Sequence, residues 1–142
     1  MDTKIDFKNP EFYENRELSW IKFDNRVLSE ARDKSIPLLE RLKFVSITSS
    51  NLDEFFMVRV ASLLDMVHAN YKKRDIAGMT ATEQLAAINK ETRELVDTQY
   101  STYTRSLVPL LNKEGIYLVD EHETLTDEQA AFVDRYFMES VY

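Results

Sequence analysis

Four small polar residues lead directly into an apolar, carboxylate-bearing segment in the stretch Thr48–Val60, which reads TSSNLDEFFMVRV. Serine, threonine and asparagine side chains compete for backbone hydrogen bonds, so they favour the ends of helices over the middles. The stretch therefore predicts a helix boundary between Ile47 and Leu52, with Asn51 or Asp53 as the N-cap. Such a boundary leaves backbone N–H groups and a side-chain amide facing outward, where a ligand can contact them.

The composition around this stretch indicates a helical globular protein. The chain has 142 residues, of which 44% are hydrophobic and 30% charged, and it contains only 2 glycines and 3 prolines. That scarcity of turn formers favours long helices. The net charge of -7 argues against binding to nucleic acid, whose phosphates would be repelled.

The sequence also carries information about the cellular compartment and about membrane association. The chain has no cysteine, which fits a reducing compartment. No apolar run approaches the ~20 residues that a membrane span needs. The first residues, MDTKID, lack the apolar segment of a signal peptide. We therefore expect a cytoplasmic protein without a transmembrane segment.

Apolar residues recur at helical spacing along most of the chain. Helices are expected over 16–32, after an N-cap at Asn15, then from Pro37 to the polar stretch, from there to about Asn70, and over 80–114. The faces expected to be buried are Trp20, Phe23, Val27 and Ala31; Leu38, Leu42 and Val45; Phe56, Val60, Leu63, Leu64 and Val67; and Leu85, Ile88, Leu95, Tyr103, Leu107 and Leu110.

The long helix has signals at its start, its interior and its end. Thr80 and Glu83 have the spacing of a capping box. Pro109 is expected to kink or divide the helix, and Gly115 to close it in a left-handed conformation.

The C-terminal residues carry a different pattern. Ile116–Val119 is β-branched and aromatic, and it is the one convincing strand candidate. Thr126 and Gln129 form another capping box before a final apolar stripe. A lone strand cannot satisfy its backbone groups. We therefore expect an all-α helical bundle with one long helix at 1–112, followed at 113–142 by the short strand-helix start of a truncated second domain.

Chemically reactive constellations are not evident. His68 and His122 lie far apart and are expected to be surface residues. Asp53 and Glu54 are adjacent, so on a helix they diverge by about 100° and cannot act as a carboxylate pair. Capping by Asp53, an ion pair for Glu54 and a carboxylate partner for Arg59 are the expected roles. Neither a catalytic residue nor a metal site is expected in this chain.

Three segments, in this order, resemble bacterial polyphosphate kinases. They read NRELSWIKFDNRVL at 15–28, PLLERLKF at 37–44 and SSNLDEFFMVRV at 49–60. The family typically reads NRELSWLxFNxRVL in the first segment and SNNLDEFFxVRV in the third. The resemblance is strong over about 14–63. The chain departs from the family at Ser46, where glycine is usual, and at Ser50, where asparagine is usual.

The resemblance implies a large cytoplasmic enzyme with an all-helical N-terminal domain, a head domain and two C-terminal catalytic domains. Such enzymes transfer the terminal phosphate of ATP reversibly to inorganic polyphosphate, through a phosphohistidine. That histidine, the magnesium ligands and most of the nucleotide site lie in the C-terminal domains, so neither His68 nor His122 matches them. The family also forms homo-oligomers.

The resemblance further implies that this N-terminal domain helps to cover the adenine of ATP, with Asn51 as the contacting residue. A carboxamide offers a donor and an acceptor together, as an adenine edge requires. One alternative is that Asn51 serves only as an N-cap. An alternative for the whole domain is a non-catalytic interaction module whose Thr80–Glu114 helix docks a protein partner.

Overall fold

The computed structural model describes residues 6–119, 121 and 124–142, and the regular secondary structure of these residues is helical, with no strand. The all-α prediction is therefore confirmed. The chain divides into two compact units, Met1–Leu107 and Val108–Tyr142. The first contains η1 (Pro10–Phe12), α1 (Arg16–Arg32), α2 (Leu38–Phe55), η2 (Phe56–Val60), α3 (Ala61–His68), α4 (Ala81–Thr102) and η3 (Tyr103–Leu107); the second contains α5 (Val108–Lys113), α6 (Asp127–Tyr136) and η5 (Phe137–Val141).

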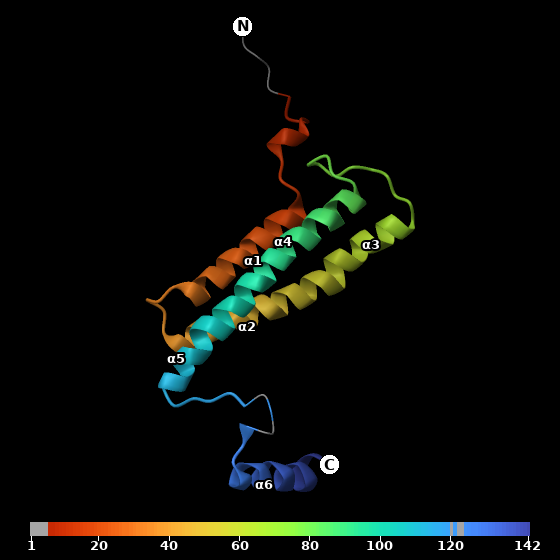
Figure 1. Cartoon of the computed structure of the whole chain (residues 1–142). Coiled ribbons are helices and arrows are strands. Elements are labelled where there is room, and N and C mark those ends of the chain that lie inside the picture. Colours follow the sequence, from red (N-terminus) through yellow and green to blue (C-terminus); the bar gives the residue numbers. More distant parts are fainter. Residues whose placement is uncertain (1–5, 120, 122–123) are drawn as a thin grey trace. The chain divides into compact units, whose positions relative to one another are not determined.

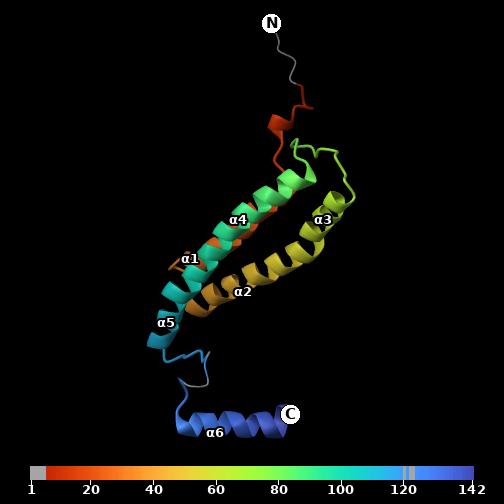
Figure 2. The same ribbon diagram turned by 45° about the vertical axis from the view of Figure 1, so that its right-hand side comes forward.

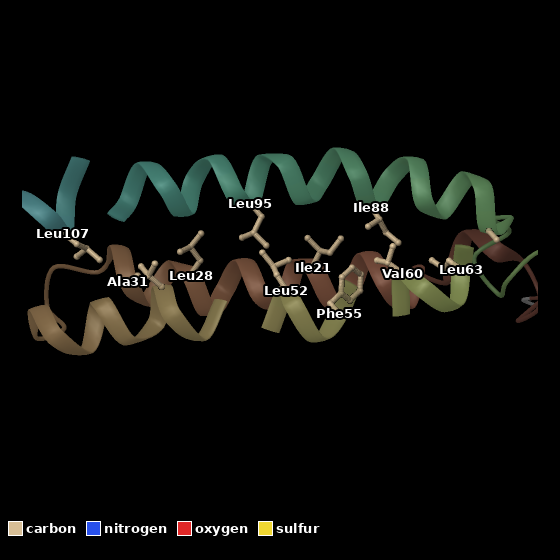
Figure 3. Packing of buried hydrophobic residues seen from close by; sticks show 12 residues of the cluster. Ile21, Leu28, Ala31, Leu52, Phe55, Val60, Leu63, Ile88, Leu95 and Leu107 are labelled. Atoms are coloured by element: carbon tan, nitrogen blue, oxygen red, sulfur yellow. The ribbon is translucent and has the colours of Figure 1, made fainter. Parts of the chain in front are cut away.

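The first unit is a bundle of three long helical segments. The chain stays helical from α2 through the π-helical turn η2 into α3, and this rod runs beside α1 and α4 (Figure 1, Figure 2). α1 packs against both α2 and α4, and α4 also packs against α3. In Figure 3, Ile88 and Leu95 of α4 point toward Ile21 and Leu52 of the facing helices. The core therefore runs along the whole length of the bundle.

Buried positions on α1 and α2 alternate between three and four residues apart, as in coiled coils. On α1 they are Glu17, Ile21, Asp24, Leu28 and Ala31, and on α2 they are Arg41, Val45, Thr48, Leu52 and Phe55. Several of these positions are polar, and their side chains bond across the bundle. The buried Gln99 of α4 likewise donates from Nε2 to the Val45 carbonyl at 2.9 Å and to Ser49 Oγ at 2.7 Å.

The π-helical turn η2 changes the phase of this pattern. The next buried residue after Phe55 is Val60, which is five positions later rather than four. A π turn adds one residue to a helix, and such insertions are frequent at functional sites. Without it, Arg59 would take the core position. With it, the apolar side of α3 continues the core and Arg59 lies at the edge.

The turn η3 shifts the long helix in the same way. After Thr102 the next buried residue is Leu107, and Ser106 lies at the edge of the core. Pro109 lies two residues after Leu107 and has no N–H to donate to the carbonyl of Arg105 in this turn. The long helix predicted over 80–114 therefore begins as expected but loses regular α geometry at Tyr103–Leu107.

The predicted helix boundary between Ile47 and Leu52 is wrong. α2 runs without interruption through Asn51, so neither Asn51 nor Asp53 is an N-cap. The small polar residues are satisfied in other ways. Thr48 Oγ1 donates to the Phe44 carbonyl one turn earlier at 2.9 Å, and Ser49 Oγ accepts from the neighbouring helix. Polar side chains with tertiary partners need not end a helix.

The apolar face predicted for the first helix is partly wrong as well. Ala31 is fully buried and Trp20 packs at the edge of the core, but Phe23 is 48% exposed. The buried residue at this level is Asp24, with 0% exposure. A charged residue enters the core here because it accepts a hydrogen bond from Asn51 on α2. Hydrophobic spacing alone could not predict this pairing.

The predicted start signals are confirmed. Asn15 Oδ1 accepts from the backbone N–H groups of Glu17 and Leu18, both at 3.0 Å, and α1 spans the predicted residues. Thr80 and Glu83 form both hydrogen bonds of a capping box at the start of α4. These caps therefore fix the first residues of α1 and of α4.

The second unit differs from its prediction in one respect. Gly115 has φ +78° and closes α5 as expected, and the capping box of Thr126 and Gln129 starts α6. Residues Ile116–Val119, however, have no regular secondary structure. A strand needs a neighbour to pair with its backbone groups, and the described residues of this unit contain none. No residue of α6 is buried.

Candidate functional site

A groove of about 400 Å³ lies between α1 and the rod formed by α2, η2 and α3. It combines aromatic, charged and amide side chains, and Asn51 is one of its lining residues. Its lining also includes Arg16, Glu17, Trp20, Glu54, Phe55 and Arg59. We call it the Asn51 groove.

Stacked aromatic rings form the apolar part of the Asn51 groove. Trp20 and Phe55 lie almost parallel, with their ring centroids 4.4 Å apart and an interplanar angle of 7°. Phe56 meets Phe55 edge to face at 5.9 Å. Phe55 is buried, whereas Trp20 is partly exposed, so the stack joins the core to the groove. Flat rings at a groove wall suit contact with another flat, apolar group.

A buried carboxylate organises the charged part. Glu17 is only 4% exposed, and its Oε1 accepts from Nε and Nη2 of Arg16 at 2.9 and 2.7 Å. Its Oε2 accepts from Nη1 of Arg59 at 3.4 Å. The predicted carboxylate partner of Arg59 is thus confirmed as Glu17. Because η2 moves Arg59 to the edge of the core, the guanidinium reaches this carboxylate across the groove.

Asn51 is held by a carboxylate that the sequence analysis did not identify. Asn51 Nδ2 donates to Asp24 Oδ1 at 2.8 Å. A carboxylate accepts but does not donate, so the –NH₂ end of the amide must face Asp24. Burial raises the pKa of the Asp24 carboxyl, and the hydrogen bond from Asn51 opposes that rise. Asp24 Oδ2 has no partner within the described residues.

This arrangement leaves two hydrogen-bonding functions of Asn51 unused. The Oδ1 atom and the second N–H of the amide have no partner in the described part of the chain. The fixed amide therefore presents one acceptor and one donor from the lining of the groove. That pair of functions is complementary to the edge of a purine or to another amide.

The other residues singled out in the sequence lie apart from this arrangement. Glu54 lines the Asn51 groove but has no ion pair among the described residues, so its expected salt bridge is wrong, and Asp53 is exposed on α2. His68 is the exposed last residue of α3. His122 lies outside the described residues. Within those residues, no cluster of three or more histidine, aspartate or glutamate side chains could hold a metal ion.

These features define a helical module with a groove between its helices. Residues 13–119 match the model of the polyphosphate kinase N-terminal domain. The chain belongs to this family. No helix in the described parts of the chain has the length and apolarity needed to cross a membrane.

Individual relatives support the assignment over nearly the whole chain. The chain is 51% identical over 138 residues to a polyphosphate kinase of Lactiplantibacillus plantarum, covering 97% of this chain and 19% of that protein. It is 48% identical over 139 residues to a polyphosphate kinase of Bacillus anthracis, covering 97% and 20%. The chain thus spans about a fifth of the length of these relatives.

The fold is also found in a solved structure. The chain superposes with a TM-score of 0.68 on the crystal structure of a polyphosphate kinase from Porphyromonas gingivalis, at 31% sequence identity. The match covers 89% of this chain and 17% of that one. The helical bundle is therefore shared with the solved enzyme.

Proposed function

We propose that this chain is the N-terminal domain of an enzyme that transfers the terminal phosphate of ATP reversibly to inorganic polyphosphate. The names of the relatives support this activity. In this proposal the domain is not catalytic alone. The phosphorylated histidine and the magnesium ligands belong to other domains of the enzyme. A cytoplasmic location is part of the proposal, because the cytoplasm supplies the ATP.

The Asn51 groove is proposed to cover the adenine of ATP. The helix break first expected at Asn51 gives no support, because the helix is continuous there. The main support is instead the bond of Asn51 to Asp24, since it leaves an acceptor and a donor of the amide free. Adenine presents an amino donor next to a ring acceptor, which is the complementary pattern. The Trp20–Phe55 stack supplies an aromatic wall beside it.

Residues 113–142, which make up most of the second unit, are proposed to begin the head domain, with the division between the domains at 112/113. In that domain Ile116–Val119 would pair with a neighbouring strand that the described residues lack. The exposed apolar side chains of α6 and η5, such as Phe132 and Phe137, would then become buried. Homo-oligomer formation is also proposed.

The role of Asn51 is tested by the substitution Asn51→Ala in the enzyme that contains all of its domains. Loss of a hydrogen bond to the base should raise the KM for ATP about tenfold and change kcat less than about threefold. The matched control is Ser50→Ala, because Ser50 is an exposed neighbour without a hydrogen bond in the described structure. An unchanged KM for ATP in the Asn51 variant would exclude contact with the base.

One observation favours the alternative of a protein-interaction module. A second, more apolar groove lies between α2 and α4, and Met57 and Tyr100 in its lining are 71% and 65% exposed. Exposed apolar side chains of this size are typical of interaction surfaces. ATP kinetics that do not respond to Asn51→Ala, together with a concentration-dependent dimer that Met57→Glu dissociates, would favour this function.

A further inference from the structure

A third groove, of about 490 Å³, lies at the end of the bundle where α1 leads into α2. Its lining has a composition unlike that of the Asn51 groove. It contains four cationic side chains, Arg32, Lys34, Arg41 and Arg105, one carboxylate, Asp97, and hydroxyl groups that include Ser106. No aromatic residue lines it. We call it the basic groove, and it contrasts with the overall charge of -7.

Arg41 shows that the positive charge of this groove is built into the fold. Its side chain is only 5% exposed. Nε donates to the Ala31 carbonyl at the end of α1 at 2.8 Å, and Nη2 donates to Ser106 Oγ at 3.4 Å. The turn η3 brings Ser106 to this position. A guanidinium has five N–H donors, so three remain without a partner in the described residues.

The cations of the basic groove outnumber the carboxylates near them in the described parts of the chain. None of the four forms an ion pair there. Asp97 lines the groove without pairing. Asp33 lies close enough to Arg41 for their charges to interact, but its Oδ1 accepts hydrogen bonds from the Ser35 backbone N–H and hydroxyl, both at 2.8 Å. A buried cation is costly unless an anion compensates it, which leaves this groove suited to an external anion.

We propose that the basic groove binds a segment of the inorganic polyphosphate chain. Arginine N–H groups form strong, charge-assisted hydrogen bonds with phosphate oxygens, and serine and threonine hydroxyls add further donors. The absence of aromatic residues from the lining disfavours a nucleotide, whose base needs an apolar wall. The choice of polyphosphate among phosphate polymers rests on the function proposed above, whereas the anion site itself rests on the geometry of the groove.

Such a site lies on the N-terminal domain and is separate from the Asn51 groove. It would hold a part of the polymer while another part reacts. Its loss should therefore weaken the binding of long chains more than that of tripolyphosphate, because a long chain can occupy several cationic contacts at once. The affinity should also fall with rising salt concentration, since binding releases counterions.

The proposal is tested by titrating this chain with long-chain polyphosphate, tripolyphosphate and ATP, and following the backbone amide signals by NMR. In the variant Arg32→Gln/Lys34→Gln/Arg105→Gln, the three exposed cations are neutralised and Arg41 is retained for stability. The matched control, Lys72→Gln/Lys73→Gln/Lys90→Gln, removes the same charge from exposed residues elsewhere. We expect the first variant to bind polyphosphate about tenfold more weakly and the control less than about twofold.

In the unmodified chain, polyphosphate should shift the amide signals of Arg41 and Ser106 in a saturable manner. The proposal is overturned by equal weakening in both variants, by the absence of saturable binding, by shifts confined to the Asn51 groove, or by ATP binding to the basic groove as tightly as polyphosphate. Asn51→Ala should leave polyphosphate binding unchanged. A failed ATP prediction and a failed polyphosphate prediction can therefore be told apart.

Discussion

At the scale of single residues, the most informative pair is Asp24 and Asn51. Asp24 is charged and fully enclosed, yet it directs the amide of Asn51 and leaves one of its own oxygens without a partner in the described structure. Such an arrangement costs stability, because burial disfavours the charged carboxylate. In the proposed function, the buried Asp24 carboxylate maintains the orientation of a ligand-binding amide despite this cost in stability.

Substitution of Asp24 should separate orientation from simple packing. Asp24→Ala removes the acceptor, so the Asn51 amide can rotate, and the KM for ATP should rise about tenfold. Asp24→Asn retains an acceptor oxygen and should stay within about threefold of the unmodified enzyme. The ratio of the KM values for GTP and ATP should fall in the alanine variant only. Equal ATP kinetics and base preference in both variants would show that Asp24 has no such role.

The pKa of Asp24 also predicts a pH dependence of stability. Because burial raises this pKa above the ordinary value of 3.8, the folded state binds more protons than the unfolded state between the two values. The contribution of Asp24 to the free energy of unfolding is thus fully present below pH 3.8 and is lost as the pH rises through the raised pKa. The variant Asp24→Asn has no ionisable group at this position, so its free energy of unfolding does not decrease in this way with rising pH.

Urea unfolding at a series of pH values measures the effect. The stability of Asp24→Asn relative to the unmodified chain should increase from about pH 3.8 upward and become constant above the raised pKa. Carboxyl groups with lowered pKa values, such as Asp33 and Glu83, have the opposite dependence but are present in both proteins. A pH-independent difference would contradict the burial of a charged Asp24.

The sequence predicted the residue-level features that depend on local chemistry. The caps at Asn15, Thr80 and Thr126 and the left-handed Gly115 follow from side-chain and backbone preferences within a few positions. The partners of Asp24, Glu17 and Arg41 could not be predicted in this way. The sequence contains only a weak indication of these buried polar residues, which is that they occur at the same three- and four-residue spacing as the apolar core residues. This spacing identifies a core position only once the neighbouring helix is known.

At the scale of elements, the π-helical turn η2 determines which residues of the following helix face the core, because it places Val60 in the core and Arg59 beside Glu17. The sequence did not predict this turn. One extra residue only moves the row of apolar residues to a neighbouring position on the helix surface, and a regular helix with a slightly different apolar face would show the same pattern. The polar stretch before it suggested a helix end, but its hydroxyls find partners inside the bundle. The strand at Ile116–Val119 was predicted from composition, although strand formation depends on a neighbour that local sequence cannot supply.

Deletion of Met57 tests the role of η2. Met57 is 71% exposed, and its removal would restore four-residue spacing between Phe55 and Val60. The bundle should therefore stay folded, with its thermal midpoint within a few degrees, and Arg59, one residue before Val60, should stay at the edge of the core beside Glu17. We expect the KM for ATP to stay within about threefold, because the contact of Arg59 with Glu17 is retained.

A deletion outside the turn provides the control. Removal of Ser50 from the regular part of α2 shifts every later core residue by one position and should unfold the domain. Circular dichroism and thermal melting distinguish the two deletions. Equal destabilisation by both would show that η2 is an ordinary part of the helix and not an accommodated insertion.

At the scale of the whole molecule, the continuous core of the first unit supports both the Asn51 groove and the basic groove. Leu95 lies at its centre with 0% exposure. Leu95→Ala should lower the free energy of unfolding by about 2–5 kcal/mol, because it removes buried methyl groups and leaves a cavity. The control Glu94→Ala, at an exposed neighbouring position, should change it by less than about 0.5 kcal/mol. Denaturant unfolding provides the measurement, and a small effect at Leu95 would contradict the described packing.

The polar contacts across this core have a consequence for the alignment of the helices. Leucine-rich helices can slide past one another by a heptad, about 10 Å, and still bury similar side chains. Such a slip would separate Gln99 from the Val45 carbonyl and Ser49, and these buried polar groups would then lack hydrogen-bond partners in an apolar interior. The helices are thus locked lengthwise, and both grooves keep a fixed spacing along the bundle.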